Sequence, residues 1–492
     1  MLGWLRKRQG HPERGPQVGG EADVETLPPV PSATLAAGAA PSLAADAGEL
    51  WRLAWPVMLS QALVTGVSLA DLAMVGRLGP GAMAAVGYAT QFFFMTQAAL
   101  LAVGFACVAL MARAIGAGRP AEARHALGAA IVVAVTTAFV VAAAVLAAPR
   151  TILSWLNAEP AVVELSVPYL RMVLGSSLLL AASLMVESGL RADRDTVTPM
   201  RVAVFVAALK VSLSAVLIFG LLGLPRLELV GAGLATVASQ LAGLLVYGAI
   251  VLRAPATSPI GLRAGDLRGG RRLVPAVVRL ALPSVGERVL LNLALLTYFA
   301  LLGRYGTVAV AAYTVGVRAL SFSWIPGMAI GAAVATLVGQ ALGRGDEQEA
   351  ERVGKRAARL AVAIALVLGT AAGIERLSIA RLFTSDPETI ATLGPFLLCL
   401  AFAQPMLQLH FTLAGIHRGA GDTWTPMVAA AVGNWGLRVP IAAIASLLLH
   451  ADLVWVWAAL VVDHTARALW LGLSLRRGRW KHRLEVAVRK AA

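Results

Sequence analysis

The sequence predicts an all-α polytopic membrane protein with twelve transmembrane helices in two six-helix lobes. Three observations lead to this fold class: the composition, the recurrence of long apolar runs, and an internal repeat. Of the 492 residues, 58% are hydrophobic and only 14% are charged, and the mean hydropathy is +0.75. A soluble domain of this length does not need so much apolar sequence, so the composition excludes a soluble globular class.

Apolar runs of about 20 residues, the length that crosses a bilayer, recur from Leu53 onward. Gly and Pro are frequent inside these runs, as membrane helices tolerate. The twelve predicted spans are 52–75, 87–112, 127–148, 165–190, 199–222, 230–252, 275–302, 310–341, 357–375, 393–416, 426–448 and 453–475.

The distribution of Lys and Arg predicts the orientation, because cytoplasmic loops carry the excess of these residues. The loops after even-numbered spans are basic; the one after span six alone holds Arg253, Arg263, Arg268, Arg271, Arg272 and Arg279. The opposite loops hold few, such as Arg77 and Arg150. We therefore expect a multi-pass protein of the plasma (inner) membrane with both termini cytoplasmic. The net charge of +15 is then a topology signal rather than a nucleic-acid footprint.

Changes in composition predict the domain boundaries. Residues 1–48 are rich in Pro, Gly and Ala, lack the apolar core of a signal peptide and are expected to form a disordered cytoplasmic tail. An N-lobe is predicted at 49–252, a cytoplasmic linker at 253–274, a C-lobe at 275–475 and a basic cytoplasmic tail at 476–492. Cys107 and Cys399 lie in apolar runs and show no metal spacing. No metal site, no cofactor and no enzymatic activity are expected.

An internal repeat relates the two halves at an offset of 227 residues. Between 56–123 and 283–350, 19 of 68 positions are identical without a gap, and the same offset aligns "RADRDTVTPM" with "RGAGDTWTPM". Eight of the identities are alanine, but Pro56/Pro283, Gly76/Gly303 and Arg77/Arg304 are less easily supplied by composition. Six helices per half is an even number, so both halves enter the membrane from the same side. This predicts a pseudo-two-fold axis along the membrane normal.

Several motifs in these repeats resemble the multidrug and toxic compound extrusion (MATE) family of transporters. They are "ADLAMVGRLGPGAMAAVGYA", "ARAIGAGRPAEA", "GLRADRDTVTPM", "LIFG" followed by "GAGLATVASQ", and "VGQALGRGDEQEA". The resemblance covers about residues 50–480. It implies twelve helices in two lobes and cation-coupled drug export, with Asp71 as the coupling acid of the first helix.

The resemblance also places this chain within the family. The sodium-coupled branch has acids near Leu291 and Leu407, which are apolar here, so the sequence looks closer to the branch whose coupling site lies in the first lobe. In that branch helix 5 carries an Asn and an Asp, where this chain has Lys210 and Ser214. Thr236 matches a threonine of the same site. The predicted cation-coupling residues are Asp71, Lys210, Ser214 and Thr236.

Two interpretations of the central charges stay open from the sequence. Intramembrane carboxylates are functional by default, which favours a coupling role for Asp71, but a static salt bridge to Lys210 is the structural alternative. Lys210 is either the switch partner of Asp71 or a lysine whose amine snorkels to an interface. A resident ammonium would repel Na⁺, which favours proton coupling.

A substrate cavity is predicted between the lobes, with Gln61, Tyr298, Glu287, Asn292 and Arg318 as candidate lining residues. Glu287 is alternatively a member of a local ion pair at the interface, and Arg318 is alternatively the partner of Glu287. Asp463 and Arg467 have the i, i+4 spacing of an intrahelical pair, which we prefer to a second proton relay.

The predicted function is export of drugs or other organic cations in exchange for a coupling cation, by alternating access. The protein is expected to act as a monomer. Protons are the preferred coupling ion and Na⁺ the alternative. A flippase for lipid-linked saccharides is the main rival, and neutral, aromatic cavity walls would weigh against it. The expected partners are small organic substrates, H⁺ or Na⁺, and the lipid bilayer, with no nucleic acid.

Overall fold

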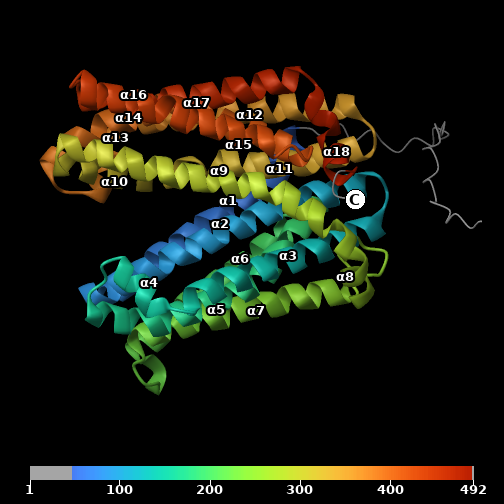
Figure 1. Cartoon of the computed structure of the whole chain (residues 1–492), viewed down its shortest axis with the longest axis horizontal. Coiled ribbons are helices and arrows are strands. Elements are labelled where there is room, and N and C mark those ends of the chain that lie inside the picture. The colour runs from blue at the N-terminus through green and yellow to red at the C-terminus, as the bar shows by residue number, and fades with distance from the viewer. Residues whose placement is uncertain (1–46, 490–492) are drawn as a thin grey trace, which may run out of the picture. The chain divides into compact units, whose positions relative to one another are not determined.

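The computed structural model describes residues 47–489 (Figure 1). Every regular element in this part of the chain is a helix, and eleven helices are long and apolar enough to cross a membrane. The predicted fold class, an all-α polytopic membrane protein, is confirmed. Nearly all of the tail predicted at 1–48 lies outside the described residues, and its last two residues begin the first helix.

The first bundle contains the first six predicted spans. Its long helices are α1 (Ala47–Gly76), α2 (Pro80–Gly116), α3 (Pro120–Leu146), α5 (Pro160–Ala192), α6 (Val197–Phe219) and α7 (Glu228–Arg253). Helix α2 packs against α3 and α5, while α6 packs between α1 and α7. Each of these helices begins before its predicted span, but α3 and α6 end two and three residues before theirs.

The second bundle contains the other six predicted spans. Its long helices are α9 (Val274–Leu302), α10 (Thr307–Ser323), α11 (Ile325–Gly343), α12 (Glu347–Ile374), α14 (Pro387–Gly419) and α17 (Leu453–Arg476). Helix α14 is central and contacts α10, α11, α12 and α17. Helix α17 corresponds to the twelfth predicted span but is not among the eleven apolar helices of the described residues, and it carries Asp463 and Arg467 in its interior.

Two predicted spans are not continuous α-helices. The span at 310–341 breaks at Trp324, because Pro326 at the start of α11 cannot donate the backbone bond that would join it to α10. The span at 426–448 alternates between α-helical and π-helical turns. Its segments are α15 (Trp424–Ala431), η4 (Val432–Arg438), α16 (Val439–Ala443) and η5 (Ile444–Leu448). Pro440 near the start of α16 removes a backbone donor there, which is consistent with the neighbouring wide turns.

Short helices occupy segments for which the sequence predicted only loops, a linker or a tail. They are α4 (Pro149–Trp155), α8 (Ala264–Gly270), α13 (Arg376–Phe383) and α18 (Arg483–Arg489), with the 3-10 turns η1 (Leu221–Gly223), η2 (Arg271–Leu273), η3 (Gly303–Tyr305) and η6 (Arg479–His482). These segments are too short and too polar to give an apolar span, so hydropathy did not reveal them.

The 227-residue offset extends to the helix boundaries. The first and last residues of α2, Pro80 and Gly116, correspond to Thr307 at the start of α10 and Gly343 at the end of α11. Helix α5 corresponds to α14 residue for residue, and even the short α4 and α13 begin 227 residues apart, at Pro149 and Arg376. The duplication therefore extends over both bundles.

The two bundles touch where α2 and α11 end. A Cβ atom on Gly116 would lie 2.1 Å from the carbonyl oxygen of Gln340, and one on Gly343 would lie 2.2 Å from that of Arg113. Only glycine permits helices to approach so closely. Nearby, Arg194 donates to Gln340 Oε1 and to Glu49 Oε1, each at 2.7 Å, and so joins α1, α11 and the turn after α5.

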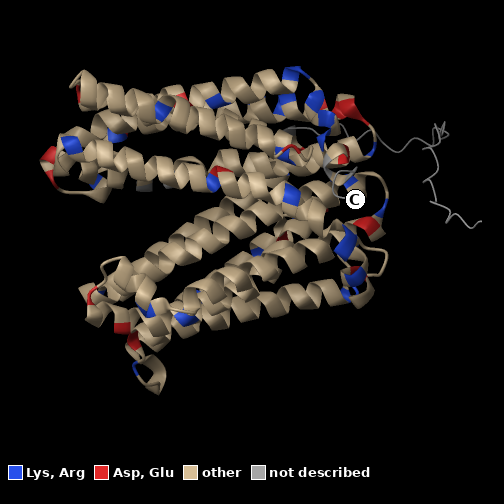
Figure 2. Cartoon of the chain, viewed as in Figure 1, with Lys and Arg blue, Asp and Glu red and all other residues tan. Residues whose placement is uncertain are grey.

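Charged residues are concentrated at the helix ends and in the connecting turns, and Lys and Arg are abundant at the end where the chain terminates (Figure 2). Between the ends, large apolar side chains such as Phe139, Leu245, Leu296 and Val367 are exposed. Exposed apolar side chains around the middle of long helices are expected where lipid replaces water.

Candidate functional site

A cavity of about 660 Å³ lies mainly within the first bundle. Helices α1, α2, α5, α6 and α7 supply almost all of its walls, and Phe322 of α10 and Phe383 of α13 complete them. Most of the lining is apolar or aromatic, with amides and hydroxyls between. The charged residues among the lining are Asp71, Glu187 and Lys210.

Asp71 and Lys210 form an ion pair at the cavity wall. Lys210 Nζ lies 2.6 Å from Asp71 Oδ2, and 12% of the lysine side chain and 21% of the aspartate side chain are exposed. The contact joins α1 to α6. The ammonium therefore stays inside the bundle, and the snorkelling alternative for Lys210 is wrong.

Two hydroxyl groups complete this cluster. Ser214, one turn after Lys210 and fully buried, donates to Asp71 Oδ1 at 3.2 Å. Thr236 of α7 donates its proton to the carbonyl of Ala232, so its oxygen accepts a hydrogen bond from Lys210 Nζ at 2.7 Å. The four residues predicted for cation coupling thus belong to one hydrogen-bonded group from three helices.

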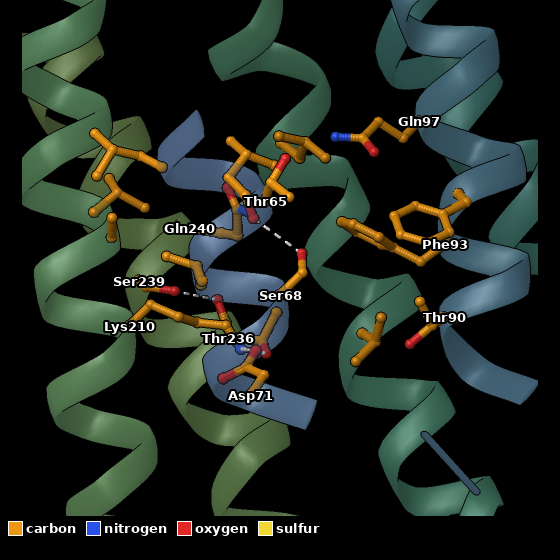
Figure 3. A pocket seen from close by; sticks show the side chains of 18 of the residues that line it. Thr65, Ser68, Asp71, Thr90, Phe93, Gln97, Lys210, Thr236, Ser239 and Gln240 are labelled. Atoms are coloured by element: carbon orange, nitrogen blue, oxygen red, sulfur yellow. Dashed lines mark hydrogen bonds and ion pairs between the residues drawn. The ribbon is translucent and has the colours of Figure 1, made fainter. Parts of the chain in front are cut away.

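Figure 3 shows Asp71, Lys210 and Thr236 beside the cavity, with Thr90, Phe93 and Gln97 of α2 on the facing wall. Sequence reasoning missed several polar lining residues, among them Gln97, Glu187 and Gln240. A signal was present for Gln240, which follows Thr236 by one helical turn. Glu187 also lines the cavity, where it forms an ion pair with Arg191 on the same helix.

Three residues predicted for the cavity lie elsewhere. Gln61 is part of α1 but is not among the cavity-lining residues. Tyr298 is 1% exposed and packs inside the second bundle, where its hydroxyl donates to the carbonyl of Val456 at 2.7 Å. Asn292 is exposed and donates to the carbonyl of Arg288. The position of a residue along a helix does not show whether its side chain faces the cavity, the core of a bundle or the outer surface.

Glu287 takes part in an ion pair rather than lining the cavity. Both of its carboxylate oxygens accept from Arg418 Nη2, at 2.9 and 2.8 Å. The guanidinium of Arg418 also lies 4.5 Å from the centre of the Phe105 ring, which belongs to α2 of the other bundle. Glu287 is thus a member of an ion pair, as the alternative held, but its partner is Arg418 of α14 rather than a local residue. Arg318 lies in α10, and its side chain is outside the described ones.

Asp463 and Arg467 form the expected intrahelical pair, with Arg467 Nε 2.5 Å from Asp463 Oδ1. The pair is almost completely buried in the second bundle, where His464 of the same helix stacks on His410 of α14. This cluster is separate from the residues that line the cavity.

The arrangement around Asp71 is suited to reversible binding rather than to covalent chemistry. The carboxylate and the ammonium can exchange protons or partners with a molecule in the cavity, and the surrounding rings and amides can hold an apolar or weakly polar molecule. A polar cavity of this kind beside the contact between two duplicated helical bundles is typical of a class of protein, the secondary transporters.

The particular family follows from comparison with known proteins. The MatE family model matches residues 56–216 and 283–444, one match in each half. The chain belongs to this family of multidrug and toxic compound extrusion transporters.

Curated relatives agree with this assignment over nearly their full length. The chain is 30% identical over 420 residues to the probable multidrug resistance protein NorM of Bradyrhizobium diazoefficiens, a match that covers 84% of this chain and 90% of that protein. It is 26% identical over 435 residues to the protein of the same name from Thermotoga maritima, covering 88% and 93%.

Solved structures support the two-lobe fold. An outward-facing conformation of a multidrug resistance MATE family transporter has a TM-score of 0.80 at 22% identity, covering 88% of this chain and 96% of that one. The bent form of the Vibrio cholerae MATE transporter VcmN has a TM-score of 0.77 at 20% identity, covering 90% and 97%.

Proposed function

We propose that the protein is a proton-coupled antiporter that exports drugs or related organic molecules across the plasma membrane by alternating access. It acts as a monomer with both termini in the cytoplasm. The observation that carries this proposal is the Asp71 carboxylate, placed at the wall of a 660 Å³ cavity within one bundle. A single chain supplies the whole charged cluster, so no second copy is needed to complete it.

The basic loops support the orientation. Arg113, Arg194 and Arg344 lie near the end at which the bundles touch, and the excess of Lys and Arg in these loops marks that end as cytoplasmic. Contact between the bundles there corresponds to an outward-open state. Asp71 is close to the opposite end of α1, which finishes at Gly76, so a proton from outside has the shorter path to it.

In the proposed cycle, a proton from outside neutralises Asp71 and breaks its ion pair with Lys210. The change in charge alters the affinity of the cavity for substrate and the relative stability of the two bundle arrangements. By linkage, substrate binding from the cytoplasm must favour loss of the proton to the same degree that the proton favours loss of substrate.

Two features support protons over Na⁺. The Lys210 ammonium already contacts Asp71, as an ion at this carboxylate would, and a second cation there would be repelled. The positions near which the sodium-coupled branch has acids are Leu291 and Leu407, and Leu407 is buried in the core of the second bundle.

The composition of the cavity weighs against a flippase for lipid-linked saccharides. Such a substrate carries phosphates and would call for unpaired cationic groups in the cavity. Among the lining residues whose side chains the structure describes, Lys210 is the one cationic residue, and it is paired with Asp71.

Transport by the purified protein in proteoliposomes, under an imposed pH or Na⁺ gradient, tests the proposal. We expect efflux of a fluorescent amphipathic dye to follow the pH gradient in the wild type and to be lost in Asp71→Asn. Lys210→Asn, measured alongside, reports whether the ammonium is needed for coupling. Retention of pH-driven efflux by Asp71→Asn, or efflux driven by Na⁺ alone, would refute proton coupling through this residue.

A further inference from the structure

The cationic position beside Asp71 is filled by a group of the protein itself. Of the three donors of the Lys210 ammonium, one points to Asp71 at 2.6 Å and one to Thr236 at 2.7 Å. Ser214 takes the other carboxylate oxygen of Asp71. A cationic molecule that sought this carboxylate would have to displace a tethered ammonium.

Glu187, the second carboxylate of the cavity, is also paired with a cation of the protein. Glu187 lines the cavity and pairs with Arg191 one helical turn later, and 21% of the Glu187 side chain is exposed. Each acidic residue among the cavity-lining residues therefore has a cation of this chain as its partner. The described part of the walls therefore offers a cationic cargo no unpaired carboxylate.

The remaining lining favours molecules without net charge. Phe93, Phe94 and Phe322 provide aromatic surface, and the amides of Gln97 and Gln240 both donate and accept hydrogen bonds. The third donor of Lys210 can meet an anionic group of the cargo, and that group would offset the repulsion between the ammonium and a cationic end placed beside Asp71. Figure 3 shows that Asp71 and Lys210 lie on the same side of the cavity, so both ends of a zwitterion can be satisfied together.

We propose that Lys210 determines the charge specificity of the cavity, and that its cargo is an amphipathic aromatic molecule of no net charge, above all a zwitterion, rather than an organic cation. This inference rests on the proposed exporter function and revises the cargo that the sequence led us to expect. It also fits antiport, because a proton on Asp71 removes the group that meets the cationic end of the cargo and leaves the ammonium of Lys210 uncompensated.

A matched pair of dyes tests the inference directly. Rhodamine B is a zwitterion at neutral pH, and its ethyl ester has the same fluorophore but a net positive charge. Binding of each dye to the full-length protein in lipid nanodiscs at pH 7.5 is measured by fluorescence anisotropy. We expect the wild type to bind rhodamine B at least about tenfold more tightly than the ester, a difference of about 1.4 kcal/mol.

Variants at the pair separate a specificity role from a structural one. Lys210→Met frees the Asp71 carboxylate and should reverse the preference in favour of the ester. Asp71→Asn frees the ammonium and should keep or increase the preference for rhodamine B. The double variant should bind both dyes alike, and Lys355→Met, at an exposed lysine of α12, should match the wild type. A static tie between α1 and α6 would change the stability of these variants without reversing the ratio of affinities.

Equal or tighter binding of the ester by the wild type would overturn the inference, as would a ratio that Lys210→Met leaves unchanged or a wild type that does not bind rhodamine B. If Lys210→Met is too unstable to purify, Asp71→Asn and the double variant still give the comparison. Proteoliposome efflux distinguishes this failure from failure of the exporter proposal. Proton-driven export of the ester at the wild-type rate for rhodamine B refutes only the charge specificity, whereas selective binding without proton-driven efflux refutes only the coupling.

Discussion

At the residue scale, the ion pair of Asp71 and Lys210 is both an energetic cost and a constraint on function. Removing two charges from water costs several kcal/mol per ion, and their attraction repays this only when the geometry is good and the remaining donors and acceptors are satisfied. Here Ser214 and Thr236 supply the additional hydrogen bonds. The attraction and the hydrogen bonds of the four residues together offset the cost of desolvation. A change in one charge therefore affects the stability of the whole group.

We expect Lys210→Met and Asp71→Asn each to lower the free energy of unfolding by about 3 kcal/mol, because each leaves one charge in the bundle without its partner. This is the low end of the range for buried pairs, since 12% and 21% of the two side chains remain exposed. The double variant should lose less than the sum of the two. Unfolding of the four proteins in mixed micelles, analysed as a double-mutant cycle, measures the coupling. Additive losses would show that the two residues do not stabilise each other.

The residue scale also shows why some site predictions failed. Glu287 and Tyr298 lie on helix α9 as expected, but their partners, Arg418 and Val456, are 131 and 158 residues away in the chain. Nothing in the local pattern distinguishes an inward residue that meets a cavity from one that meets another helix. Asp71 was easier to interpret because a carboxylate in a span is rare and expensive whatever its surroundings.

At the element scale, the repeat explains where the bundles touch. Gly116 and Gly343 are equivalent positions, at the ends of α2 and α11, and each faces backbone of the other bundle. The sequence showed them as repeated glycines in two turns. Their function is close packing between helices, which requires small residues in membranes.

Gly343→Ala should weaken this contact. Its Cβ would lie 2.2 Å from the backbone oxygen of Arg113, and a backbone atom cannot rotate away, so the bundles must separate. Overpacking of this kind costs about 1–3 kcal/mol, which unfolding in mixed micelles can measure. Gly303→Ala is the control, since no atom lies within 4 Å of its added Cβ, and its effect should stay within about 0.5 kcal/mol. Equal effects of the two substitutions would refute the packing role.

The sequence predicted where helices occur better than where they are interrupted. Apolar length is a local property, so the spans were found. The break at Trp324 and the wide turns at Val432–Arg438 depend on proline and on how the neighbouring helices pack around it. Hydropathy averages over such points and does not detect them.

At the scale of the whole molecule, the C-terminal segment connects the two bundles. Arg113 of α2 pairs with Glu485 at 2.6 Å, and Lys481 pairs with Glu347 at 3.0 Å and with Glu351 at 2.7 Å, both on α12. Trp480 is 3% exposed and anchors the segment in the second bundle. Residues 480–485 thus contact both bundles at the end where the bundles touch, although the sequence predicted a tail there.

The pH dependence of this connection follows from the pKa shifts of its ionic groups. The hydrogen bond from Lys481 lowers the pKa of Glu351 below its usual 4.5, and the same bond raises the pKa of Lys481 above 10.5. A lowered carboxyl pKa stabilises the docked form above pH 4.5 and loses that effect as the pH falls. A raised lysine pKa stabilises it below pH 10.5 and loses that effect as the pH rises. The contribution of Lys481 and Glu351 to docking should therefore be constant between these limits.

Fluorescence anisotropy of a dye attached at Val486→Cys measures docking of the segment. We expect the anisotropy to fall below pH 4.5 as Glu351 is protonated. Lys481→Met should lower the anisotropy and reduce the acid transition. Arg119→Met, which removes an exposed pair with Glu122, is the control and should behave like the parent. An acid transition that Lys481→Met leaves unchanged would contradict the assignment to this lysine and glutamate.

The fold class, the spans and the duplication could be predicted from the sequence, because apolar length and repeated motifs are properties of short segments. Its resemblance to a family also brought Asp71, Lys210, Ser214 and Thr236 together as a candidate site. The packing of the helices was needed to show that Lys210 contacts Asp71, that Glu187 also lines the cavity and that Tyr298 does not. These facts depend on how helices distant in the chain rotate and pack against one another, and that packing is a property of the assembled bundles.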